Sequence, residues 1–234
     1  AKAEQKKWQE MADKGAEKIK GKWVVGDDLK KVHEQVGKLL REYMELMRTE
    51  QTLKAIPKLE EVIRVYPNSF EAHFELGFFY LVKGGNAQYA KAIGSLEQAS
   101  RLRPNSPETF TNLAIAYNFG KRYEDSVVAA YKAAQIEDSK PVVQNLINAL
   151  SYAPPGMRQN NPKVRPILEE SGLLASRHGI GGPANQWIYM RPKPRAGGGP
   201  GNDAAPGSPQ QRGIIGSGTG FFVTADGYIL TCLF

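Results

Sequence analysis

The chain has 234 residues, 41% of them apolar, which suits one or two domains with a hydrophobic core. No apolar run approaches the roughly 18 residues that a membrane-spanning helix needs, so we expect no membrane span. The net charge of +7 lies in the flanks: residues 1–31 carry nine Lys or Arg against six Asp or Glu, and residues 157–212 carry eight against three. Residues 32–156 balance at fourteen each. This pattern describes basic tails, so we expect no nucleic-acid partner.

The residue types that hold metals and phosphates are sparse. Cys232 is the single cysteine, which excludes an internal disulfide and a cysteine-based metal cage. The histidines His33, His73 and His178 show no metal-ligand spacing. Gly197–Gly199 lies in a Pro/Gly-rich stretch without a predicted strand before it or a helix after it. We therefore expect no metal and no cofactor.

A repeat is visible in the middle of the chain. The Tyr-Pro-Asn-Ser of residues 66–69 recurs as Arg-Pro-Asn-Ser at 103–106 and, more weakly, at 137–140, in steps of 37 and 34 residues. Leu76-Gly77 follows the first copy of this four-residue motif, and Leu113-Ala114 follows the second copy. Small residues let two antiparallel helices approach closely, and the proline ends each second helix. The period and these positions resemble the tetratricopeptide repeat (TPR).

The resemblance implies a mainly α fold, a solenoid of TPR helical hairpins over residues 28–152. The repeats are clear over 70–139, a further one is predicted over 28–69, and an end helix over 141–152. Residues 1–27 are expected to form a basic helix or flank.

In TPR proteins the first helix of each unit lines a concave groove that holds a peptide or a partner protein. The residues that match those lining positions are Glu71, Phe74, Glu75, Phe78, Glu108, Thr111, Asn112, Ile115, Asn118, Phe119 and Asn145. The alternative is that the three phenylalanines complete the core between units. The clamp that binds carboxylate termini in TPR cochaperones is excluded, because Phe74 and Val142 stand where lysines are needed.

Residues 153–212 are predicted to be a Pro/Gly-rich flexible linker, with a short helix over 163–176. Trp187-Ile188-Tyr189-Met190 suggests an extended segment that docks on another part of the molecule.

Residues 213–234 predict a β-hairpin, with strands at 219–224 and 228–233 around Asp226-Gly227. The run from Gly216 to Thr231 resembles the opening of an HtrA-like, trypsin-fold serine protease domain. The resemblance implies an incomplete β-barrel and favours the cell envelope. It assigns no catalytic residue, since Ser217 matches the approach to the first strand and Asp226 the hairpin turn.

Two functional hypotheses follow. In the first, the chain is a protein-interaction module, the N-terminal arm of an HtrA-like serine endopeptidase that is cut short here before its catalytic triad. This chain itself is then without hydrolytic activity, and the longer parent protein is the enzyme. In the second, the chain is a complete, non-catalytic TPR scaffold or adaptor.

Overall fold

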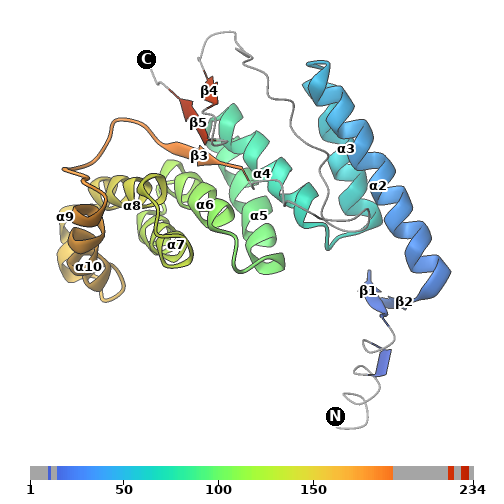
Figure 1. Ribbon diagram of the computed structural model, residues 1–234, viewed down its shortest axis with the longest axis horizontal. Helices are drawn as coiled ribbons and strands as arrows, with labels where there is room; N and C mark the ends of the chain where they lie inside the picture. The colour runs from blue at the N-terminus through green and yellow to red at the C-terminus, as the bar shows by residue number, and fades with distance from the viewer. Residues whose placement is uncertain (1–9, 12–14, 192–220, 224–227, 232–234) are drawn as a thin grey trace. The chain divides into compact units, whose positions relative to one another are not determined.

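The computed structural model describes residues 10, 11 and 15–191, and the backbone of residues 221–223 and 228–231. These residues are mainly α-helical (Figure 1). Contacts between residues divide the chain into two compact units, Ala1–Leu76 and Gly77–Phe234.

In the first unit, helices α2 (Gly26–Arg48) and α3 (Thr52–Val65) pack together as a hairpin, followed by the start of α4 (Phe70–Lys83). Each helix buries one apolar stripe at spacings of three and four residues. The stripe residues are Val36, Leu39 and Tyr43 on α2, and Ala55, Ile56, Leu59 and Val62 on α3.

Residues 17–24 form a short antiparallel hairpin, which differs from the helix that was one of the two alternatives expected over 1–27. Strand β1 (Glu17–Ile19) pairs with β2 (Lys22–Val24), and the turn residues Lys20 and Gly21 have φ angles of 49° and 81°. Positive φ at both central positions is what a type I′ hairpin turn requires. The helix expectation was based on charge alone and overlooked this turn.

The second unit stacks further helices after the end of α4. They are α5 (Asn86–Leu102), α6 (Pro107–Phe119), α7 (Tyr123–Ile136), α8 (Lys140–Tyr152), α9 (Pro155–Asn160) and α10 (Val164–Arg177). Consecutive helices from α5 to α8 pack in pairs, and α10 packs on α7 and α8. The arrangement is a TPR-like array of helical hairpins. Its helix starts follow from the sequence: Ser106 caps α6 by accepting a hydrogen bond from the Thr109 amide, and Pro107 occupies the first turn.

Close helix packing in this unit depends on small residues. A Cβ atom added at Gly77 would lie 2.5 Å from Cγ of Leu96, so α4 and α5 approach too closely for any larger side chain there. Ala92, Ala99, Ala130 and Ala133 are likewise fully buried. Small residues at such positions let neighbouring helices approach closely.

Residues 153–190 hold more structure than the flexible linker that the composition suggested. Helix α10 covers the stretch where a short helix was expected, and α9 precedes it. Strand β3 (Ile188–Met190) then pairs with β5 (Tyr228–Thr231), which pairs in turn with β4 (Phe221–Val223). Both pairings are antiparallel, with Tyr189 opposite Ile229 and Phe222 opposite Leu230. The rest of the predicted 213–234 hairpin, with Ser217, Asp226 and Cys232, lies outside the described residues.

In the part of the chain that the structure describes, no helix combines the length and apolarity needed to cross a membrane.

We predict opposite effects for two glycine substitutions. Gly77→Ala forces the new methyl group against Leu96 and should lower the free energy of unfolding by about 1–3 kcal/mol. Gly94→Ala, at an exposed position of α5 with open space around it, should raise that free energy by up to about 1 kcal/mol. Urea titrations of both variants check this, and a neutral Gly77→Ala would contradict the packing described here.

Candidate functional site

Two buried asparagines hold the main chain of residues that lie far along the sequence. The Asn112 carboxamide donates from Nδ2 to the Met190 carbonyl at 2.6 Å, and its Oδ1 accepts from the Met190 amide at 2.9 Å. Asn145 likewise donates to the Ile188 carbonyl at 2.6 Å and accepts from the Ile188 amide at 3.0 Å. Each carboxamide therefore satisfies both the donor and the acceptor of one residue, as a neighbouring β-strand would.

Helix α8 continues this pattern toward the beginning of the bound stretch. Asn148 donates to the Gln186 carbonyl at 2.8 Å and accepts from the Ala184 amide at 2.7 Å. Gln144 donates to the Gly182 carbonyl at 3.1 Å. We call Asn112, Asn145, Asn148 and Gln144 the asparagine ladder, and residues 182–191 the docked segment. Figure 1 shows the docked segment running from α10 across α8 and α6.

The ladder is buried and therefore has to be hydrogen-bonded. Asn112, Asn145 and Asn148 are at most 1% exposed. A buried polar group without a partner costs about 1–3 kcal/mol. The docked segment supplies hydrogen bonds to all three carboxamides.

Aromatic side chains hold the docked segment at alternate residues. Trp187, only 3% exposed, stacks on Tyr152 with ring centres 5.7 Å apart and meets Phe119 edge-on at 6.4 Å. Tyr189 is also buried and meets Phe78 edge-on at 6.4 Å. Such pairs add about 0.5–1.5 kcal/mol each beyond the area that they bury.

A cationic side chain makes the next contact along the docked segment, two residues after Tyr189. The guanidinium of Arg191 lies over the ring of Phe78, 4.5 Å from its centre. Cation–π contacts of this kind contribute about 0.5–2 kcal/mol. Residues 187, 189 and 191 are two apart, so an extended backbone places them on one face.

The approach to the docked segment is anchored at the end of α10. Gly179 has φ of 60° and ends the helix, with the Ile180 amide bonding back to the Ala175 carbonyl at 2.9 Å. The Asp138 carboxylate accepts from the ring of His178 at 2.6 Å and pairs with Arg177 at 2.7 Å. The hydrogen bond from His178 and the charge of Arg177 hold the pKa of Asp138 below its usual value.

The predicted groove residues fall into three groups. Phe78, Asn112, Phe119 and Asn145 contact the docked segment.

Other predicted residues of the second unit lie within α6. Thr111, Ile115 and Asn118 are buried, and Thr111 Oγ1 and Asn118 Oδ1 have no hydrogen-bond partner within the described residues. Glu108 accepts from the hydroxyl of the cap residue Ser106 at 2.9 Å.

The remaining three belong to the first unit. Phe74 is 1% exposed and stacks on Phe70 at 5.7 Å, and Glu75 accepts from the Tyr43 hydroxyl at 2.8 Å. Glu71 is partly exposed at the start of α4. A role for these residues in ligand binding stays a prediction.

Sequence reasoning missed Gln144, Asn148 and Tyr152, because it carried over only the positions that matched the TPR pattern. The available signal was the spacing of the amides on α8, where Gln144, Asn145 and Asn148 share one face of an otherwise apolar helix. Buried carboxamides must be hydrogen-bonded, and the single bond within this face, from Gln144 to Asn148, leaves most of its donors and acceptors to groups outside the helix.

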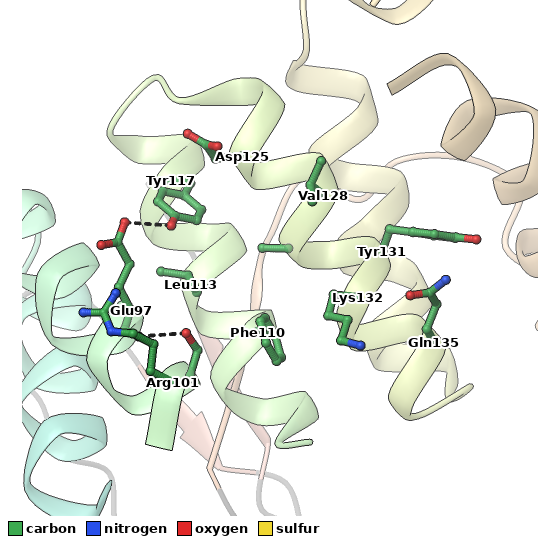
Figure 2. A pocket seen from close by; sticks show the side chains of 12 residues that line it. Glu97, Arg101, Phe110, Leu113, Tyr117, Asp125, Val128, Tyr131, Lys132 and Gln135 are labelled. Carbon is green, nitrogen blue, oxygen red and sulfur yellow. Dashed lines mark hydrogen bonds between the residues drawn. The ribbon is translucent and has the colours of Figure 1, made fainter. Parts of the chain in front are cut away.

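A hollow of about 470 Å³ lies among α5, α6 and α7, away from the ladder (Figure 2). Tyr117 donates to Glu97 at 2.8 Å there, and burial together with that carboxylate raises the pKa of Tyr117 well above its usual range. Its lining mixes both charges, including Arg101, Asp125 and Lys132. It contains none of the predicted groove residues. The part of the chain described also holds no cluster of three or more His, Cys, Asp or Glu that could bind a metal.

No protein-family model and no curated protein matches the chain. Among solved structures it is similar to a double mutant of MamA from RS-1, at 19% identity and a TM-score of 0.47 over 61% of this chain and 76% of that one. A mutant Thermobaculum terrenum O-GlcNAc transferase is similar at 22% identity and a TM-score of 0.47, over 62% of this chain and 26% of the transferase. The C-terminal part of a TPR repeat-containing protein from Cytophaga hutchinsonii is similar at 16% identity and a TM-score of 0.47, over 61% of this chain and 54% of that one. Similarities at this level say nothing of what this chain binds.

We predict that Asn145→Ala loosens the docked segment. The substitution removes both hydrogen bonds to Ile188, so amide hydrogen exchange over residues 187–190 should accelerate at least about tenfold. Asn160→Ala, at an exposed position of α9, is the matched control and should leave that exchange unchanged. Equal exchange in the two variants would show that the ladder does not hold the segment.

Proposed function

We propose that the chain is a protein-interaction module that binds an extended polypeptide through the asparagine ladder. The observation that carries this proposal is the paired bonding of Asn112 to Met190 and of Asn145 to Ile188. Both contacts are made to main-chain atoms, so the ladder accepts many sequences. Selectivity then comes from the side-chain contacts beside it.

The chemistry of the ladder favours binding over catalysis. A carboxamide neither donates nor accepts a proton in the physiological range, and the ladder contains no ionisable side chain. The nearby groups with clearly shifted pKa values, Tyr117 and Asp138, bond to other side chains of the array and not to the docked segment. We therefore assign the ladder a recognition role, as in a scaffold or adaptor.

The binding experiment uses the full chain and a fluorescein-labelled peptide with the sequence of residues 182–191, followed by fluorescence anisotropy. A peptide N-methylated at the position of Ile188 loses the amide that Asn145 accepts from, so its binding should weaken at least about tenfold. Methylation at the position of Asn185 is the matched control, because that residue is exposed and its amide makes no hydrogen bond among the described residues. Equal loss from both peptides, or equal binding by an Asn112→Ala/Asn145→Ala variant, would contradict the proposal.

A second candidate function is that of the N-terminal arm of an HtrA-like serine endopeptidase. Its support is the resemblance of residues 216–231, together with the antiparallel pairing of β4 with β5 in that stretch. In that protein the helical array would recruit substrates or dock the enzyme in an assembly.

This candidate is tested by the coding sequence of the natural gene beyond codon 231 and by the intact mass of the native protein. A histidine codon soon after Leu230-Thr231 and a later Gly-rich serine loop are the expected result. A stop codon after Phe234 with a matching mass would leave the scaffold function alone.

A further inference from the structure

The docked segment occupies the ladder in the manner of a ligand. It meets α6 and α8 through its main chain, and it follows a short irregular connection that leads from His178 to Gly181. Gly181 in this connection has open space where a side chain would be. The connection tethers the segment to α10, and the bonds to the ladder are made by the segment itself.

The side-chain contacts define which sequences suit the site. Trp187 fills the space beside Tyr152 and Phe119, and Tyr189 meets Phe78 two residues further on. Between them, Ile188 gives its main-chain groups to Asn145 and is only half buried. A branched apolar side chain is thus tolerated there without being enclosed.

The third position of the series takes a cation. Arg191 extends over Phe78, the same ring that Tyr189 meets edge-on, and its side chain remains exposed. An acidic side chain at this position would place negative charge against the negative face of the ring. Met190, the residue before this cation, is buried at 2% exposure. The pattern read from these contacts is aromatic, any residue, aromatic, apolar residue, cation.

We infer that residues 182–191 are a self-ligand that blocks the asparagine ladder, and that its partners are extended segments with the same pattern of aromatic, any residue, aromatic, apolar residue and cation. This inference rests on the proposed function and adds the ligand class and the regulation of the site. A partner binds by displacing the docked segment, which remains attached through its tether.

Attachment gives the self-ligand an advantage that a free peptide must overcome. A short tether holds a bound group at an effective concentration on the order of millimolar. A competing peptide therefore binds the intact chain more weakly than it binds a chain whose own segment has been released. The difference between the two affinities measures the blocking.

The experiment compares the full wild-type chain with a full-length variant carrying Trp187→Ala and Tyr189→Ala. These changes remove the aromatic contacts of the self-ligand and leave every ladder residue in place. The probe is the labelled peptide of residues 182–191 with its natural sequence. We expect the variant to bind it at least about tenfold more tightly than the wild-type chain does.

Two further peptides test the pattern on the same Trp187→Ala/Tyr189→Ala variant. Only the peptide changes between these measurements, so the fold of the protein is the same in each. A peptide with alanine at the positions of Trp187 and Tyr189 should lose nearly all binding. A peptide with glutamate at the position of Arg191 should bind several-fold more weakly.

The outcomes separate the two proposals. Equal, ladder-dependent binding by the wild-type chain and the variant would overturn the self-ligand and leave the proposed function standing. If the variant binds the natural peptide more tightly but binds the alanine and glutamate peptides equally well, the ligand pattern is overturned. Absence of ladder-dependent binding to either protein, with circular dichroism showing both folded, would overturn the proposed function and this inference with it.

Discussion

The second unit depends on one constraint, which is that a buried carboxamide must be hydrogen-bonded. Asn112, Asn145 and Asn148 are enclosed by apolar neighbours on α6 and α8, and no main-chain group of the array is bonded to their side chains. Left empty, each would cost about 1–3 kcal/mol unless water entered. The docked segment meets this requirement at successive positions and is held extended as a result.

The same segment links the helical array to the β-strands. Its residues 188 and 190 turn their main-chain groups toward the ladder, so the main chain of Tyr189 faces the opposite edge, where β5 pairs antiparallel with β3. A single strand is thus bonded to helices along one edge and to a strand along the other. Helical repeats present binding surfaces of this kind because neighbouring hairpins repeat at a fixed spacing.

The sequence predicted the helical array well, because its signals are local. The prolines after the second helices act on the residues directly before them, and the small residue Gly77 meets the next helix along the chain at Leu96. It also indicated that Trp187–Met190 docks on another part of the molecule, and two of the predicted groove residues, Asn112 and Asn145, contact that segment. It did not reveal that these asparagines bond to the docked segment. Asn112 and Met190 are 78 residues apart and Asn145 and Ile188 are 43 apart, so no local pattern couples them. Over 153–190 it predicted one short helix, and the structure adds α9, because proline is accepted in the first turn of a helix.

The central claim is that the ladder and the docked segment stabilise each other, and a double-mutant cycle on the unfolding free energy tests it most directly. Asn145→Ala removes the main-chain contact, and Trp187→Ala removes the side-chain anchor beside it. If the segment is held by both, the second change costs less once the first has released it, and we predict a coupling of about 1 kcal/mol or more. Additivity within about 0.5 kcal/mol would contradict the account.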